Sequence, residues 1–229
     1  ACCLGAFLPI LHAEDNRFSA IESEFQLAVS ENPETSQAAI ARLRSRGEMA
    51  FRELLDLRDA YATDLDRQTE LASLAQVIDL VGGARYCSVS RLYWHTDWNQ
   101  ALQVAQQTKK PILSLRMMGN LTDEYSCANS RFFRTTLYAN REIADYLQNH
   151  YVLHWRSVRP VPKVTIDYGD GRKLERTLTG NSIHYVLDTR GRVLDGLPGL
   201  YAPQMFLSWL QQLQQLHQSL AEISPSDQD

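Results

Sequence analysis

The sequence of 229 residues lacks the features that most directly assign a chain to a membrane or to nucleic acid. No run of about 18 or more apolar residues is present, and a helix needs about that length to cross a bilayer. Basic residues are not in excess, because 23 lysines and arginines stand against 27 acidic residues, for a net charge of −4. Nucleic-acid-binding domains usually carry a basic face, so the composition disfavours a nucleic-acid partner.

Motifs of the common hydrolytic and phosphate chemistries are also missing. No Ser-His-Asp order, glycine-rich phosphate loop or pair of carboxylates stands out in the sequence. The histidines lack the tight spacing of metal ligands, although His154 and His184 are both expected on strands, where the two could be neighbours. Histidines of the core or of a sheet edge are the favoured interpretation, and we expect neither a metal nor a cofactor.

The chain has only four cysteines, too few for disulfides to be the main scaffold of a protein of this length. Cys2 and Cys3 lie in an apolar segment, residues 1–13, that is followed at once by acidic residues. This pattern is typical of the end of a secretory signal, or of a lipoprotein junction with Cys2 lipidated. Both interpretations predict export, with the protein periplasmic or attached to the membrane through its N-terminus. A buried N-terminal strand or helix is the third interpretation.

Apolar residues at helical spacing dominate the next part of the chain, residues 14–84. Three helices are predicted, over 17–29, 35–57 and 64–80. Thr35 and Ser36 are the expected caps of the second helix, Gly47 interrupts it, and Asp64 caps the third. We interpret this region as a helical extension that offers a packing or interaction surface.

Residues 85–223 alternate between strands and helices, and residues 224–229 form a polar tail. Helices are expected over 98–108 with Asp97 as cap, 141–149 and 202–223; strands are expected at 86–93, 111–115 and 151–155 and in two hairpins around turns at 169–171 and 188–191. A strand–helix–strand unit gives a parallel pair, and the late hairpins give antiparallel edges. The prediction is an α/β fold, a mixed sheet with helices on both faces.

This order of elements resembles the thioredoxin fold with one inserted hairpin, Lys163 to Thr179. The segment from Trp98 to Leu113 is similar to the opening "W…AL..A…KP(I/V)" of thioredoxin-like envelope proteins, and Gln148-Asn149-His150-Tyr151-Val152 is similar to their helix ending "N-x-(F/Y)-V". In that family the strand leads into a Cys-x-x-Cys motif at a helix start. Cys127-Ala128-Asn129-Ser130 occupies this place, so the resemblance implies handling of protein thiols and disulfides.

The chain departs from the family pattern at three places. Ser130 stands in place of the second cysteine, the loop before Cys127 is longer than usual, and Ser182 stands where thioredoxins carry a cis-proline. The result is a Cys-x-x-Ser variant. A single thiolate can form a mixed disulfide but cannot resolve it internally.

Cys127 is the candidate nucleophile, and its chemistry depends on where the helix begins. A start at Thr122 would leave Cys127 in the second turn, whereas a start at Ser126 would place it in the first. In the first turn, unpaired N–H groups and the helix dipole favour the thiolate. The other candidate site residues are Ser130 as a donor to the sulfur, Arg131 and Arg134 as sources of positive potential, and Ser182 as a binding residue.

Two functions stay open at this point. The first is monothiol exchange through Cys127, with the mixed disulfide resolved by an outside thiol, or by Cys87 if the fold brings it near. In the second, Cys127 is a small buried apolar residue, and the protein is a non-catalytic binding or assembly module whose helical extension and inserted hairpin contact a partner protein. Cys87 and Cys127 could also form a structural disulfide or both stay free.

Overall fold

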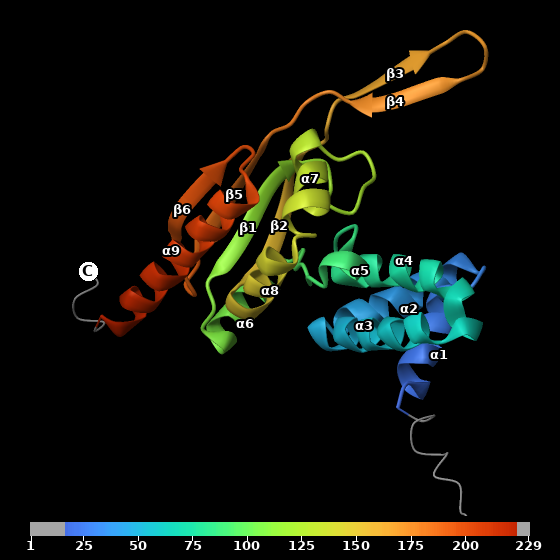
Figure 1. The fold of residues 1–229 in the computed structure, drawn as a ribbon, viewed down its shortest axis with the longest axis horizontal. Coiled ribbons are helices and arrows are strands. Elements are labelled where there is room, and N and C mark those ends of the chain that lie inside the picture. The colour runs from blue at the N-terminus through green and yellow to red at the C-terminus, as the bar shows by residue number, and fades with distance from the viewer. Residues whose placement is uncertain (1–16, 224–229) are drawn as a thin grey trace, which may run out of the picture. The chain divides into compact units, whose positions relative to one another are not determined.

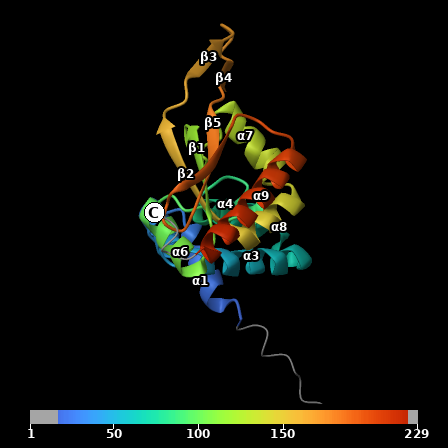
Figure 2. The same cartoon turned by 90° about the vertical axis from the view of Figure 1, so that its left-hand side faces the viewer.

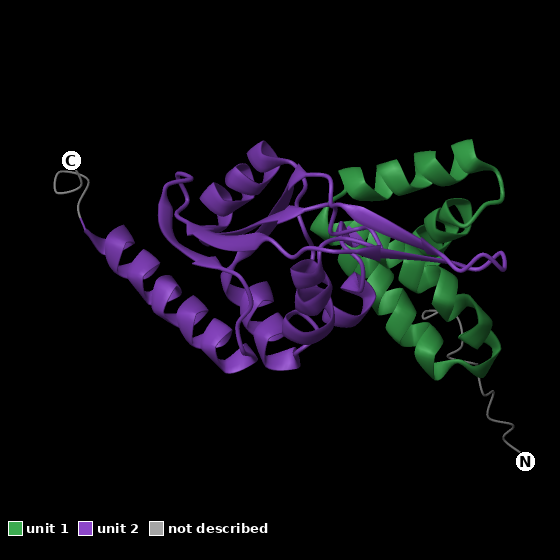
Figure 3. Cartoon of the chain, turned by 90° about the horizontal axis from the view of Figure 1, so that it is seen from above, with its two compact units in different colours: residues 1–81 green, residues 82–229 purple. Residues whose placement is uncertain are grey.

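The computed structural model describes residues 17–223, which divide between two compact units, residues 1–81 and 82–229 (Figure 3). The expected leader, residues 1–13, the lipidation hypothesis for Cys2 and the polar tail, residues 224–229, lie outside the described residues. Among the described helices, none has the length and hydropathy that a bilayer-spanning segment requires.

The first unit is helical, as the periodicity predicted. Its elements are α1 (Ser19–Ala28), α2 (Pro33–Ser45), α3 (Glu48–Thr63), the short 3-10 helix η1 (Leu65–Glu70) and α4 (Leu71–Gly82). The core of this unit includes Phe25, Leu43, Phe51, Leu54, Leu74 and Ile78, all nearly inaccessible to solvent. Their spacing of three and four residues places them on the inner faces of the helices.

The ends of these helices differ from the prediction at three points. Asn32, and not Thr35 or Ser36, caps α2, because its side chain accepts hydrogen bonds from the backbone N–H groups of residues 34 and 35 at 2.9 and 3.2 Å. Gly47 does not merely interrupt a helix: with φ of 68° it separates α2 from α3. Asp64 caps η1, and α4 follows only after that turn.

The second unit is built around a mixed sheet of four strands in the order β2-β1-β5-β6, within the residues described (Figure 1). The strands of this sheet are β1 (Ile112–Met118), β2 (Val152–Arg159), β5 (Ser182–Leu187) and β6 (Val193–Pro198). β1 pairs in parallel with β2, and the pairs β1–β5 and β5–β6 are antiparallel. The strands β3 (Lys163–Asp167) and β4 (Lys173–Thr177) form a separate hairpin.

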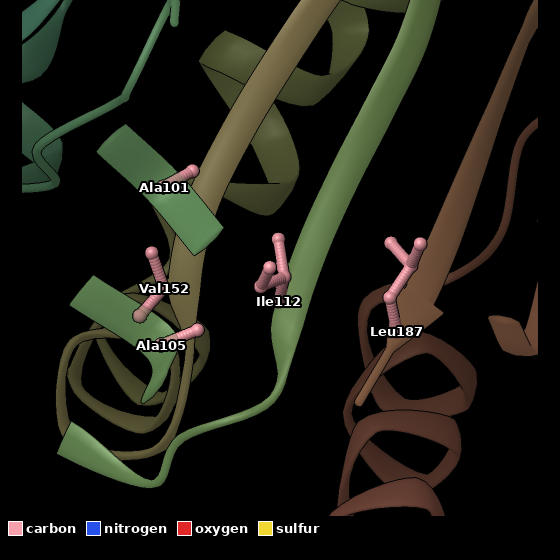
Figure 4. Packing of buried hydrophobic residues seen from close by; sticks show 5 residues of the cluster. All are labelled: Ala101, Ala105, Ile112, Val152 and Leu187. Carbon is pink, nitrogen blue, oxygen red and sulfur yellow. The ribbon is translucent and has the colours of Figure 1, made fainter. Parts of the chain in front are cut away.

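Helices cover both faces of the four-stranded sheet, as expected (Figure 2). Helix α6 (Trp98–Thr108) lies on one face, and α8 (Arg141–His150) and α9 (Pro203–Glu222) lie on the other. The expected cap of α6 is confirmed, because Asp97 Oδ1 accepts the Gln100 N–H at 2.8 Å. Under α6, Ala101 and Ala105 pack on Ile112, with Val152 and Leu187 beside it (Figure 4).

The prediction of a strand at residues 86–93 is wrong. Residues 87–90 form the single helical turn α5 (Cys87–Ser90), which lies between two left-handed residues, Tyr86 with φ of 63° and Arg91 with φ of 58°. The Arg91 N–H donates to Cys87 O at 2.8 Å and closes the turn. Positive φ at two non-glycine residues is uncommon, and apolar spacing alone does not reveal it.

His154 and His184 are on strands, but they are not neighbours. His154 on β2 is the partner of Ser114 in β1, whereas His184 on β5 is the partner of Leu115. Because successive residues of a strand point to opposite faces, the two rings lie on opposite sides of the sheet. His154 Nδ1 is 2.8 Å from Ser114 Oγ, and His184 Nε2 is 2.6 Å from Tyr138 Oη.

Burial of His184 predicts that acid destabilises the protein. Burial lowers the pKa of His184 to about 3, whereas an unfolded histidine has a pKa of about 6.5. In the window between these values the unfolded chain binds the extra proton, so stability rises with pH and is lost as the pH falls. At pH ~5 the loss from His184 is about 2 kcal/mol relative to pH ~7.5.

The measurement is the free energy of unfolding by urea across this pH range, for the wild type and for His184→Gln, whose amide can still bond Tyr138. The variant is expected to lose about 2 kcal/mol of the pH dependence. A residual slope of the same sign remains from His154, because burial lowers its pKa to about 4. Identical pH dependence in the two proteins would contradict the assignment of the proton to His184.

Candidate functional site

Cys127 lies at the start of the helical segment that follows β1. It is the N-cap residue of the short helix α7 (Ala128–Phe132), with φ of −59° and ψ of 155°. A start at Thr122 is therefore wrong, and the helix begins one residue later than a Ser126 cap would place it. The chain continues as the π-type turn η2 (Phe133–Leu137), in which the Tyr138 N–H donates to Phe133 O at 2.8 Å.

The sulfur of Cys127 is fully buried beneath residues 177–182, the segment between β4 and the start of β5. Cys127 Sγ lies 3.8 Å from Asn181 O, and the Ala128 N–H donates to Thr179 O at 3.2 Å. On the other side, the Cys127 N–H donates to Met118 O at the end of β1, at 3.4 Å. The cysteine is thus held between a strand end and a covering segment.

Side chains fasten both ends of this covering segment, which we call the cover. At one end, Thr177 Oγ1 donates to Ser126 O at 3.0 Å. At the other, Asn129 Nδ2 donates to Ser182 Oγ at 3.0 Å, which is the role that the structure gives to the candidate binding residue Ser182. Sequence reasoning missed this bond, because Thr177 and Ser126 are 51 positions apart and no local spacing relates them.

Ser130 does not donate to the sulfur, which corrects the expected role. Its hydroxyl lies 2.6 Å from Ser126 Oγ and 2.8 Å from Cys127 O. A serine three residues after a helix start is well placed to bond back to the backbone, and this local geometry draws the hydroxyl away from the thiol. Ser130 is fully buried, so it stabilises the turn around the cysteine.

Arg134 organises the long loop that precedes Cys127. Its guanidinium is buried and donates to Leu121 O at 3.1 Å, to Asp123 O at 2.9 Å and to Ser126 Oγ at 2.9 Å. Burial, followed by the charge of Arg85, lowers the pKa of Arg134 from its ordinary value. A guanidinium offers five N–H donors in a planar fork, and here they serve carbonyl and hydroxyl groups of the loop.

The remaining candidates, Arg131 and Cys87, lie on two short helices, α7 and α5. Arg131 is half-buried on α7. Cys87 is buried on α5, and within the described residues no disulfide joins it to Cys127. The hypothesis of a structural disulfide between Cys87 and Cys127 is therefore wrong. The described residues also contain no group of three or more His, Cys, Asp and Glu side chains arranged to hold a metal ion.

Cys127 lies in a turn that is closed to solvent. Its polar side chains are engaged with one another and with backbone groups, and the cover separates the sulfur from solvent. A disulfide substrate would reach the sulfur only after the cover moved. No known protein family matches this chain in sequence, and no curated protein is similar enough to count as a relative.

Removing the guanidinium of Arg134 is expected to destabilise the protein. Arg134→Met keeps the apolar stem but leaves the loop carbonyls and the Ser126 hydroxyl without their donor, so unfolding should become easier by about 2–4 kcal/mol. The matched control is Arg131→Met, which also removes one positive charge but should change stability by less than about 0.5 kcal/mol. Urea denaturation measures both, and equal effects would show that only net charge matters.

A methyl group at position 180 is expected to loosen the cover. A Cβ there would collide with the Asn129 side chain, and moving that amide breaks its bond to Ser182. Gly180→Ala should raise the population of the opened cover about fivefold, which corresponds to about 1 kcal/mol. The measurement is the alkylation rate of Cys127 in the native protein, read from the peptide that contains it by mass spectrometry.

The control is the variant pair Asn129→Ala and Asn129→Ala/Gly180→Ala. Once the amide is gone, the alanine at 180 has nothing to displace, so the two should be alkylated at the same rate. If Gly180→Ala accelerates alkylation equally with and without Asn129, the collision is not the cause. Rapid alkylation of Cys127 in the wild type would contradict the seal itself.

Proposed function

We propose that residues 82–229 form a thioredoxin-like module that binds a partner protein and does not catalyse thiol–disulfide exchange. The thioredoxin-like assignment is supported by the parallel β1–β2 pair, the antiparallel β5–β6 pair and the closing helix α9. It is also supported by the place of Cys127, at a helix start after β1. The single observation that carries the binding role is the exposed apolar face of the hairpin β3–β4.

Burial of Cys127 argues against a catalytic thiol. The thiolate must reach the disulfide sulfur that it attacks, and reactive cysteines are partly exposed in electropositive surroundings. Cys127 is inaccessible, Ser130 bonds elsewhere, and the nearby Arg134 is committed to the loop. These contacts make Cys127 a packing residue of the turn.

The inserted hairpin supports the binding role, because it is amphipathic and stands away from the four-stranded sheet (Figure 1). Ile166 on β3 is the cross-strand partner of Leu174 on β4, and the next pair, Thr165 with Glu175, points to the opposite face. Ile166 and Tyr168, which comes two residues later, just after β3, are 45% and 54% exposed. A two-stranded hairpin is marginally stable alone, and exposed apolar faces mark interaction sites.

The face that carries Ile166 and Leu174 also carries a charge. Arg176 is the cross-strand partner of Val164 on that face, and among the described residues it donates to the Glu175 carbonyl rather than to a carboxylate. A partner surface that is apolar with an acidic group beside it complements this face. We call residues 164, 166, 174 and 176 the hairpin face.

The experiment is photocrosslinking in cells, with a photoreactive residue at position 166 on the hairpin face. We expect a discrete product with one partner protein. A photoreactive residue at position 165, on the same strand but the opposite face, should give little of that product. Because Cys127 has no catalytic role in the proposal, Cys127→Ala should leave the product unchanged, whereas Arg176→Glu should reduce it.

Two results would contradict the proposal. The first is equal crosslinking from positions 165 and 166, because the apolar face would then have no special role. The second is a mixed disulfide trapped through Cys127 in cells and lost in Cys127→Ala, because the buried sulfur would then take part in exchange.

A further inference from the structure

One face of the four-stranded sheet changes from apolar to cationic along β1. The residues of β1 on the α6 side are Ile112, Ser114 and Arg116. Ile112 is buried beneath the alanines of α6 (Figure 4). Helix α6 begins at Trp98. The centroid of its ring lies 5.3 Å from that of His154, the strand partner of Ser114. Arg116 comes one step further along the strand and is only partly buried.

Arg116 is placed beside a second arginine. It is the cross-strand partner of Arg156 in the parallel pair β1–β2, so both side chains leave the same face of the sheet. Burial, and then the charge of Arg156, lower the pKa of Arg116. Among the described residues neither arginine has a carboxylate partner, whereas Arg42 and Arg67 in the helical unit pair with Glu24 and Glu22.

Placing these two arginines side by side destabilises the folded protein, and no other contact among the described residues accounts for the arrangement. Like charges directly opposite each other destabilise a pair of strands, and partial burial adds the loss of hydration. An anion bound by both guanidinium groups would relieve the repulsion and compensate for the lost hydration. A guanidinium presents its N–H donors in a planar fork that matches a carboxylate.

Beside Arg116 the surface is hollowed, with a volume of about 280 Å³. The hollow is lined by Arg116, Val158, Asn181, Ser182, Ile183 and Tyr185. Gly196 on β6 shapes its floor, because a Cβ there would approach Tyr185 Cε1 to 3.0 Å and Ile183 Cδ1 to 3.2 Å. Without a side chain at 196, the rings and methyl groups of Tyr185 and Ile183 lie close over β6.

The hollow therefore combines a cationic end with an apolar floor. Its volume is at the lower limit of ligand pockets, which measure about 300–1,000 Å³, so a compact ligand fits better than a large cofactor. We propose that this hollow, together with Arg156, binds a small organic carboxylate, with the carboxylate held by Arg116 and Arg156 and the apolar body resting on Ile183 and Tyr185. This site does not involve the hairpin face and is independent of the function proposed above.

The test is a nuclear magnetic resonance titration of the full chain with three probes. 3-Phenylpropionate supplies a carboxylate on an apolar body, 3-phenylpropanamide is its neutral counterpart, and inorganic phosphate is an anion without an apolar body. We expect saturable binding of the carboxylate, with shifts of the Arg116, Ile183 and Tyr185 signals. The amide and phosphate are expected to bind at least about tenfold more weakly.

Variants assign the binding to the arginines. Arg116→Gln and Arg156→Gln should each weaken 3-phenylpropionate binding about tenfold or more, because each removes a charge-assisted bond. Arg141→Gln on α8 is the matched control, since it removes the same charge from an exposed side chain and should leave affinity unchanged. Arg156 is exposed, so Arg156→Gln is expected to fold and to keep or raise the melting temperature as the repulsion is relieved.

The outcomes separate clearly. Loss of binding in both arginine variants, with Arg141→Gln unchanged, supports the proposal. Equal binding of the carboxylate and the amide, or unchanged affinity in Arg156→Gln, would overturn the role of the arginines. Phosphate binding as tightly as 3-phenylpropionate would overturn the role of the apolar floor, and no saturable binding of any probe by the folded chain would overturn the site.

Discussion

Burial of β1 on both faces is the constraint on which the second unit depends. On one face, Ile112 packs under α6. On the opposite face, Leu115 is the strand partner of His184. The ring centroid of His184 lies 4.9 Å from that of Phe206 in α9. β2 and β5 both take their register from this strand. The same strand positions both regions of interest, because it carries Arg116 opposite Arg156 and because Met118 O accepts the Cys127 N–H where the strand ends.

The groups that predicted chemistry at Cys127 make other contacts in the folded chain. A helix start, a nearby serine and nearby arginines are the ingredients of a reactive thiol, and all are present. In the folded chain Ser130 bonds the backbone, Arg134 holds the loop, and the cover lies over the sulfur. The cover is also the continuation of β4, so the hairpin face and the seal over the cysteine belong to one continuous segment.

Local patterns predicted most elements well and failed where contacts are long-range or the backbone is unusual. Helix α6 with its Asp97 cap, α8 and the two hairpins follow from periodicity and turn residues, which are properties of short segments. The single turn α5 depends on left-handed Tyr86 and Arg91, for which the residue types give no signal. The separation of His154 from His184 depends on strand order, because β1 lies between β2 and β5.

The sequence by itself determined the α/β class, the succession of helices and strands, and the position of Cys127 near a helix start, because hydrophobic period, caps and turns are written in neighbouring residues. Only the tertiary structure decided whether the cysteine is accessible and which charges meet. Asn181 covers Cys127 from 54 positions away. Arg116 and Arg156 become neighbours only through the parallel register of β1 and β2. Accessibility and charge pairing are properties of the packed chain, and no local pattern encodes them.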